Sequence, residues 1–555
     1  MTINHEMLCD DTLLNIFRQY LDAAPRLWPL LTHVCRRWRQ VVLRSPLGLQ
    51  LRLYCTYGTP VLKNLDCLPP VPLVIAYGGS PMLNPPTPED EDNIITALKQ
   101  SDRVNSISLT LTNSFLGKLS MISEPFSELE EVVLVSQDKS QLTLPTTFRC
   151  GSHLRTLHVT RIAIPSLPRL LSSSTDLVDL QLDEIPLAGY FPPQVFANVL
   201  SGASHLRSLS LHFLSYPPRR TLFSLATPGD HHIVLPVLTS FKYRGISKYL
   251  DNIMARIDTP RLQDIDITFF SQPTMDASQL GRFIERTETL TSLTEAKIQI
   301  SAHAISISFP NLIPSTRLQL QISCRQLDWQ LSSMAQVCDQ FSPFLSGVNH
   351  LAFNSNDFPS GQGDVDGEQW LQLVRSFGGA STLSISGESS TGLLCALRPA
   401  NEGYTTDTTV LPALRNLHVQ KPTLADLPFW DAAQSLATSL GLSYHLIDSE
   451  ADVLCQVCKT HFAPQEFKEH LVAQHAYEIV CSYCGDFQFT LAYIHRLQEH
   501  LRMIHPEIAQ NDELVMRSTL ALTPFQFDTL AKWHSSLRKP HIVAPSTLVT
   551  VPDFQ

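Results

Sequence analysis

The chain has 555 residues, of which 43% are hydrophobic and 17% charged, and its formal net charge is −11. This composition excludes a disordered or collagen-like chain, and the length corresponds to about three to five folding units. A modestly acidic chain has no general attraction for nucleic acid or an anionic membrane, so any such contact would have to be local.

The first residues, MTINHEMLCDDTLLNIF, carry acidic side chains before their apolar run, whereas a signal peptide would carry basic ones. No stretch of the sequence reaches the roughly 18 consecutive apolar residues that a membrane span needs. We therefore expect an intracellular protein of the cytoplasm or nucleus, not secreted and without a membrane partner. Its twelve cysteines are expected to be reduced.

Residues 1–50 are predicted to form a small helical module. Apolar residues recur at helical spacing from Leu13 to Leu21 and, after two prolines, again from Leu31 to Val42. A module of this size cannot cover all its apolar side chains, so an apolar strip would be left for a partner helix. The alternative is that the helices cap the open end of the domain that follows.

The runs MLCDDTLLNIFRQYL and LWPLLTHVCRRWRQVVLRSP resemble an F-box, and residues up to about 79 are similar to those of a large group of basidiomycete F-box proteins. The family usually has proline where this chain has Cys9. The resemblance implies binding to the Skp-type adaptor of cullin ubiquitin ligases. The residues that match the apolar motif, and are therefore the implied adaptor contacts, are Leu8, Leu13, Leu14, Ile16, Phe17, Val34 and Trp38. The arginines of the second run are predicted to form a solvated face.

Residues 51–92 are expected to connect this module to the next domain, and the proline- and acid-rich stretch 80–92 reads as a linker. Over 93–445 the pattern apolar-x-x-apolar-x-apolar recurs about every 28 residues, and each copy predicts one short strand that must stack on its neighbours. Faint copies are expected near 293, 318 and 380. The recognisable copies begin at Val104, Leu129, Leu154, Leu177, Leu206, Leu238, Leu262, Val348 and Leu414.

This pattern resembles leucine-rich repeats, although the spacing varies from 23 to 34 residues and the Asn or Cys that usually follows the strand is missing. The predicted fold class is α/β: an N-terminal helical F-box, then an irregular leucine-rich-repeat-like solenoid, then a small zinc-finger module. An irregular α/β domain is the alternative for the middle region. The repeat boundaries between about 212 and 347 stay open.

Residues 446–506 contain two patterns of structural zinc sites, because two thiolates on a turn precede two imidazoles at helical spacing. The segment resembles tandem two-Cys, two-His zinc fingers, and four protein ligands would leave no open position for catalysis. His495 with His500 is an alternative way to complete the second site. The predicted ligands of the two zinc ions are Cys455, Cys458, His470 and His475, and then Cys481, Cys484, His500 and His505.

Residues 507–555 are expected to form a helix after Thr523 and a loose tail. The charged residues of each finger balance, so protein contact is favoured over binding of nucleic acid, which remains possible.

The F-box resemblance implies a non-catalytic substrate-recognition subunit of a Skp–cullin–F-box ubiquitin ligase. The F-box would bind the adaptor, and through it a cullin, while the repeats and zinc fingers would bind an unidentified target protein. The sequence has no P-loop, GxSxG or HExxH motif, and no catalytic residue is expected. Two alternatives are a zinc-finger nucleic-acid-binding regulator and an interaction scaffold without ligase coupling.

Overall fold

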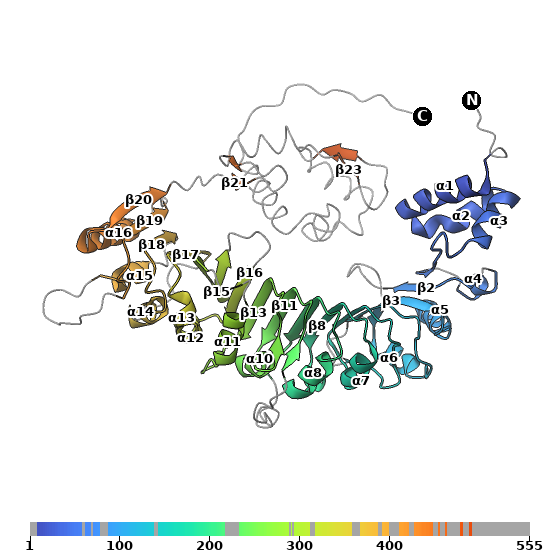
Figure 1. Cartoon of the computed structure of the whole chain (residues 1–555), viewed down its shortest axis with the longest axis horizontal. Helices are drawn as coiled ribbons and strands as arrows, with labels where there is room; N and C mark the ends of the chain where they lie inside the picture. The colour runs from blue at the N-terminus through green and yellow to red at the C-terminus, as the bar shows by residue number, and fades with distance from the viewer. Residues whose placement is uncertain are drawn as a thin grey trace, which may run out of the picture. The chain divides into compact units, whose positions relative to one another are not determined.

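Figure 1 shows the computed structural model of the chain, which divides into two compact units, residues 1–447 and 448–555. In the second unit it describes only four short strands. In the first unit it describes residues 8–57, 61–67, 70–77, 87–137, 142–216, 232–287, 290, 293–310, 317–357, 367–386, 391–398, 410–420 and 427–447. Among all these residues, no helix is both long enough and apolar enough to cross a membrane.

The first unit begins with the predicted helical module, which contains α1 (Asp10–Ala23), the 3-10 turn η2 (Pro25–Leu27), α2 (Trp28–Val34) and α3 (Arg36–Arg44). The single run predicted from Leu31 to Val42 is divided at Cys35, whose backbone is extended, into α2 and α3. Cys9 and Cys35 stand at the N-caps of α1 and α3, and the Cys35 thiol accepts a hydrogen bond from the Trp38 amide at 3.4 Å. Pro29 lies at the start of α2, where its missing N–H costs no helical hydrogen bond.

A sixteen-stranded sheet follows, and it is parallel except around β15. In spatial order its strands are β1 (Leu53–Cys55), β2 (Leu73–Tyr77), β3 (Val104–Leu111), β4 (Glu131–Ser136), β6 (Thr156–Thr160), β8 (Asp179–Ile185), β9 (Ser208–Phe213), β11 (Ser240–Gly245), β13 (Asp264–Phe270), β16 (Arg317–Ser323), β15 (Ala304–Pro310), β14 (Glu295–Ser301), β17 (His350–Asp357), β18 (Thr382–Ser386), β19 (Asn416–Gln420) and β20 (Ser443–Ile447).

Helices lie along one side of this sheet, and most of them pack against a neighbouring helix (Figure 1). They are α4 (Val61–Cys67), α5 (Pro88–Leu98), α6 (Asn113–Leu119), α7 (Leu167–Ser173), α8 (Pro193–Leu200), α10 (Ser247–Met254), α11 (Ser278–Arg286), α12 (Leu327–Gln340), α13 (Ser342–Leu345), α14 (Gly367–Arg375), α15 (Thr391–Ala396) and α16 (Leu427–Leu440). Smaller elements are β5 (Leu142–Thr143), β7 (Ile162–Ala163), η3 (Leu187–Gly189), β10 (Ile233–Val234) and β12 (Ile257–Asp258).

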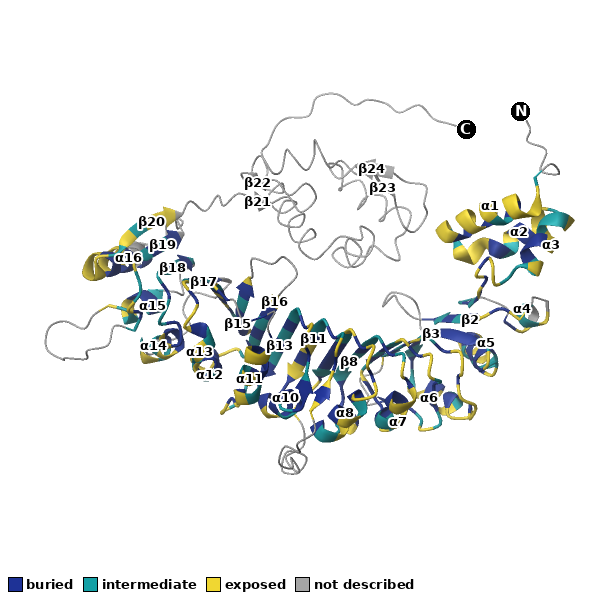
Figure 2. Cartoon of the chain, viewed as in Figure 1, coloured by how far each residue is buried: buried dark blue, intermediate teal, exposed yellow. Residues whose placement is uncertain are grey.

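The repeating unit is thus one strand followed by a returning segment, as the period of the sequence predicts. Each recognisable copy of the apolar pattern lies at a strand of the sheet, and its apolar residues are buried between the sheet and the helices (Figure 2). Leu414 alone among them is only partly buried. The prediction of a mixed α/β chain, with N-terminal helices before a stack of strand-containing repeats, is confirmed at this level.

The stack is interrupted where the sequence left the repeat boundaries open. The faint copies near 293 and 318 correspond to β14 and β16, but an unpredicted strand, β15, runs antiparallel between them. As a result β13 pairs with β16, and β14 pairs with β17. The reversal arises because β14 and β15 are joined by a tight turn at 302–303, which turns the chain straight back along the sheet.

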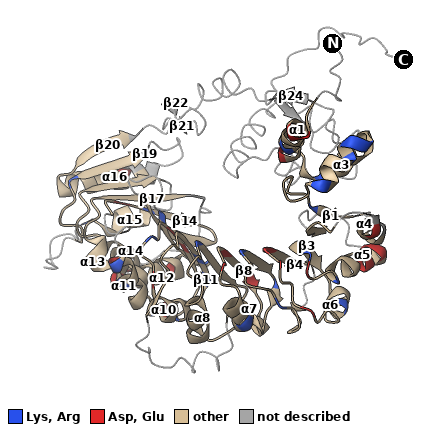
Figure 3. Cartoon of the chain, turned by 45° about the vertical axis from the view of Figure 1, so that its right-hand side comes forward, with Lys and Arg blue, Asp and Glu red and all other residues tan. Residues whose placement is uncertain are grey.

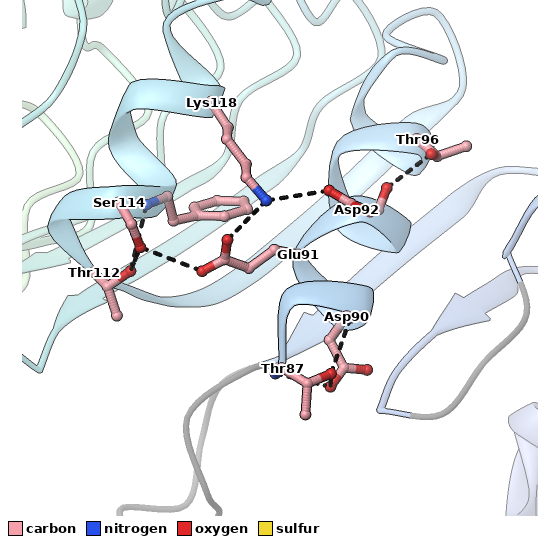
Figure 4. Close-up of polar contacts among 9 residues, drawn as sticks. Thr87, Asp90, Glu91, Asp92, Thr96, Thr112, Ser114 and Lys118 are labelled. Atoms are coloured by element: carbon pink, nitrogen blue, oxygen red, sulfur yellow. Dashed lines mark hydrogen bonds and ion pairs between the residues drawn. The ribbon is translucent and has the colours of Figure 1, made fainter.

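Residues 51–92 differ from the expectation of a connecting segment. They contribute β1 and β2 to the sheet, and α5 begins at Pro88, inside the stretch assigned to a linker. Thr87 and Asp90 form a capping box: the Asp90 amide donates to Thr87 Oγ1 at 3.2 Å, and the Thr87 amide donates to Asp90 Oδ2 at 3.1 Å (Figure 4). Carboxylates are favourable in the first turn of a helix, so this acidic run is a helix start.

The acidic turn also joins α5 to the next helix. Lys118 Nζ on α6 lies 2.9 Å from Glu91 Oε2 and 3.1 Å from Asp92 Oδ1 (Figure 4). These are solvent-accessible ion pairs, which contribute little to stability individually, so the packing of apolar residues such as Ile94 and Phe115 holds the two helices in place.

Candidate functional site

The N-terminal helices enclose a filled apolar core. The Trp28 side chain is buried, and its indole Nε1 donates to the Arg52 carbonyl oxygen at 2.7 Å. The Arg26 guanidinium lies 5.1 Å from the centre of the Tyr54 ring in β1, a cation–π distance. These contacts join the module to the first strand of the sheet, as expected for helices that cap a repeat domain.

The structure separates the seven predicted adaptor contacts into three groups. Leu13 is 1% exposed and Phe17 is 0% exposed, so both are core residues and cannot line a docking surface in this conformation. Leu8, Leu14 and Trp38 are partly buried against the core. Only Ile16, at 44%, and Val34, at 58%, are largely exposed.

This outcome corrects the expectation that the whole apolar ladder of the motif is a contact surface. The physical reason is that one face of α1 packs against α3, which buries the residues at positions 13 and 17. Contact by Leu13 and Phe17 would need the module to open, whereas Ile16 and Val34 are accessible without any rearrangement. Adaptor binding itself stays a prediction.

Further exposed apolar residues lie on the same helices, and the sequence analysis did not select them. Tyr20 follows Ile16 by one turn on α1, and Leu30 precedes Val34 by one turn on α2. Leu27, in η2, is also exposed. α1 and α2 therefore each present an apolar i, i+4 pair to solvent, and that spacing is the signal that could have found them.

Two arginines of α3 (Figure 3) have structural contacts that the sequence analysis did not predict. Arg37 donates to Asp10 Oδ1 at 2.9 Å and to the Leu8 carbonyl oxygen, which fixes the start of α1 against α3. Arg39 Nε donates to the Thr32 carbonyl oxygen at 2.8 Å, at the end of α2. These side chains orient the helices, so they are part of the module's framework as well as of its basic face.

The face of the sheet opposite the repeat helices, called here the helix-free face, is polar. Its side chains alternate with the buried ones; on β6, for example, they are Thr156, His158 and Thr160. Neighbouring strands are in register, so side chains of this face form rows across the sheet. Such a broad polar surface on a rigid scaffold suits the binding of another macromolecule.

Two histidine–aspartate pairs stand near the middle of the helix-free face. His158 Nε2 lies 2.8 Å from Asp179 Oδ2, and His212 Nδ1 lies 3.0 Å from Asp183 Oδ1. The hydrogen bond from His212 lowers the pKa of Asp183 despite its partial burial. For Asp179, burial alone would raise the pKa, but hydrogen bonds from His158 and neighbouring side chains bring it below its ordinary value. Both aspartates are therefore ionised at neutral pH.

Ser210 completes an arrangement with His212 and Asp183 that invites comparison with a nucleophile–base–acid triad. Its hydroxyl oxygen lies 3.4 Å from both His212 Nε2 and Asp183 Oδ1. The hydroxyl donates toward the carboxylate, and the residue is buried. A serine held in this way is not activated for attack by the histidine, so we assign no nucleophile to this face.

The eight predicted zinc ligands lie outside the described residues. The structure does describe two antiparallel hairpins there: β21 (Val453–Leu454) pairs with β22 (His461–Phe462), and β23 (Glu478–Val480) pairs with β24 (Gln488–Thr490). In sequence, each hairpin encloses one Cys-x-x-Cys pair. Among the residues that the structure describes, no group of three or more His, Cys, Asp or Glu side chains is arranged to hold a metal ion.

No family model matches the chain, and no curated protein matches it. Among solved structures, the chain is similar to a leucine-rich-repeat protein of Leptospira interrogans, with 12% sequence identity and a TM-score of 0.25. That similarity covers 72% of this chain and 89% of the other. The strand order and register described above are what define the repeat fold of this chain.

Proposed function

We propose that this chain is a non-catalytic substrate receptor of a Skp–cullin–F-box ubiquitin ligase. The observation that carries the proposal is the exposure of Ile16 and Val34 on helices whose core is already full. Apolar side chains that a folded module leaves open are typical of a surface for a partner helix. The sequences of these helices resemble an F-box, which gives the class of partner: a Skp-type adaptor.

In this proposal the repeat domain binds the target protein through its helix-free face. The reaction is ubiquitin transfer, carried out by other subunits. The chain's contribution is proximity, because holding a target near the charged enzyme raises the effective concentration of its lysines. The contacts of Trp28 with Arg52 and of Arg26 with Tyr54 would fix the orientation of the adaptor-binding module relative to the repeats that follow.

The test is co-purification of the adaptor with the full chain. Ile16→Asp combined with Val34→Asp places charges on the exposed positions without touching the core, so we expect folding to persist and adaptor binding to fall at least about tenfold. Met121→Asp is the matched control, since Met121 is 84% exposed and lies in the repeat region. Equal binding by the double variant and the control contradicts the proposal. A wild-type chain that binds no adaptor favours a scaffold without ligase coupling.

We also propose that the second unit holds two structural zinc ions on the ligand sets predicted from the sequence, Cys455, Cys458, His470 and His475 and then Cys481, Cys484, His500 and His505. The support is that each Cys-x-x-Cys pair falls between the two strands of a short antiparallel hairpin, the usual place of the thiolates in such fingers. Bound zinc would supply much of the folding free energy of this unit.

Metal analysis of the full chain is expected to give two zinc ions, falling to one in Cys455→Ser or in Cys481→Ser. Gln488→Ser is a control on a hairpin strand that removes no ligand. An unchanged zinc content in both cysteine variants contradicts the assignment. Steep salt-dependent binding of the full chain to duplex DNA would instead support a nucleic-acid-binding regulator.

A further inference from the structure

A row of imidazoles crosses the helix-free face at the far end of the sheet. Ser384 on β18, His418 on β19 and His445 on β20 are direct register partners, so their side chains stand next to one another on the same face. His350 on β17 reaches into this row, because its Nε2 lies 2.8 Å from Ser384 Oγ. Three histidines separated by up to 95 residues in sequence are thereby brought together by strand pairing alone.

The rings of His418 and His445 lie against each other. Their ring centres are 5.2 Å apart, with an angle of 87° between the planes. Neither ring has a hydrogen-bond partner among the described residues, which sets them apart from His158 and His212, each of which contacts an aspartate.

A carboxylate lies near the other ring nitrogen of His350. Its Nδ1 lies 3.5 Å from Glu295 Oε1, which leaves Nε2 directed at Ser384, one strand away from His418. A carboxylate that holds one ring nitrogen while the other is free to ligate is the usual outer support of a metal-binding histidine. Glu295 is thus placed to orient His350 rather than to bind an ion itself.

We propose that His418 and His445 bind a divalent transition-metal ion, with His350 joining as a third ligand when its ring turns away from the Ser384 hydroxyl. Neutral imidazoles suit Zn²⁺, Ni²⁺ and Cu²⁺ and do not suit Mg²⁺ or Ca²⁺, which take oxygen ligands. His445 is exposed and His418 and His350 are half-buried, so an ion can enter from solvent and water can complete its coordination. Its ligands differ from those of the proposed zinc fingers, which begin at Cys455 in the sequence.

The test is calorimetric titration of Ni²⁺ into the full chain as purified, with the zinc content measured before and after. We expect one Ni²⁺ site per chain that leaves the zinc content unchanged. His418→Ala and His445→Ala are each expected to abolish it. Glu295→Gln is expected to weaken it by about 10- to 100-fold, since it removes the support of His350.

His158→Ala is the matched control, because His158 lies on the same face but contacts Asp179, and it should leave Ni²⁺ binding unchanged. Thermal unfolding of each variant checks that the sheet is intact, and His418→Gln repeats the loss of ligation with a side chain of similar size. A wild-type chain that takes up no Ni²⁺, or one that still binds it after both His418→Ala and His445→Ala, overturns the site. Unchanged Ni²⁺ binding by His350→Ala would contradict the assignment of His350 as a third ligand.

Discussion

The Asp251 carboxylate, on α10, accepts a hydrogen bond of 2.6 Å from the backbone amide of Gln279, at the start of α11. The same oxygen accepts a second hydrogen bond, of 3.2 Å, from the Leu280 amide. The residue that would ordinarily cap α11 from within is Ala277, whose side chain cannot do so. One repeat therefore caps the helix of the next, which couples their stability.

This contact predicts a pH dependence. Burial raises the pKa of Asp251 to about 6, even though two amides donate to it. In the unfolded chain an aspartate loses its proton near pH 4, so between about pH 4 and 6 the native state binds more protons than the unfolded state. The contribution of Asp251 to stability therefore falls as pH rises through this window.

Asp251→Asn is expected to remove this pH dependence while keeping an oxygen that accepts from the α11 amides. Thermal unfolding of both chains at pH 4.5 and 7.5 would show the variant gaining stability relative to wild type at the higher pH. Asp251→Ala is the control, because it also lacks the titrating group but has no acceptor, so it should be about 1 kcal/mol less stable than Asp251→Asn at both pH values. Parallel pH profiles for wild type and Asp251→Asn would contradict the prediction.

Two adjacent glycines, Gly378 and Gly379, test how closely the backbones of neighbouring repeats approach each other. A Cβ on Gly379 would lie 2.0 Å from the Ser346 carbonyl oxygen, whereas a Cβ on Gly378 would meet nothing within 4 Å. Gly379→Ala is expected to lower the free energy of unfolding by about 1–3 kcal/mol, because the Ser346 backbone cannot yield as a side chain could. Gly378→Ala should be neutral or slightly stabilising. Denaturant unfolding distinguishes the two, and equal effects would refute the predicted contact.

Phe17 and Trp38 form an edge-to-face pair, with ring centres 4.7 Å apart. Phe17→Ala is expected to destabilise the N-terminal module by about 3–5 kcal/mol, since Phe17 is wholly buried. Ile16→Ala, one residue earlier and largely exposed, should change stability by less than about 1 kcal/mol. Limited proteolysis of residues 8–57 would measure the difference. If Phe17→Ala left the module as resistant as Ile16→Ala, the packing described for α1 would be incorrect.

Thiol reactivity should divide the cysteines of the first unit sharply. Burial raises the pKa of Cys150 and of Cys338 to about 12, so both should resist alkylation in the folded chain. Cys9 is exposed, and its hydrogen bond with Thr12 lowers its pKa. Iodoacetamide at pH 8 should modify Cys9 at least about tenfold faster than it modifies Cys150 or Cys338. Site-resolved mass spectrometry would measure these rates. All three cysteines should react at similar rates only after denaturation. Similar alkylation rates in the native chain would contradict the burial of Cys150 and Cys338.

The repeats could be predicted from sequence because their signal is local. The spacing of Leu206, Leu209 and Leu211 already predicts that these side chains face the core, and the same spacing recurs at most strands of the sheet. The antiparallel strand β15 carries the same alternation, in Ile305, Ile307 and Phe309, yet its neighbours could not be predicted. Alternation fixes which face a residue occupies, while strand order depends on pairings between segments distant in the chain.

The candidate sites show the same division. By itself the sequence determined that residues 10–44 form amphipathic helices and that each strand has one polar face, since both follow from short-range periodicity. Only the tertiary structure decided that Phe17 is enclosed while Ile16 is open, because three helices compete for one small core. Only strand pairing brought His350, His418 and His445 together, because register is set by the combined packing of the whole sheet and no local spacing encodes it.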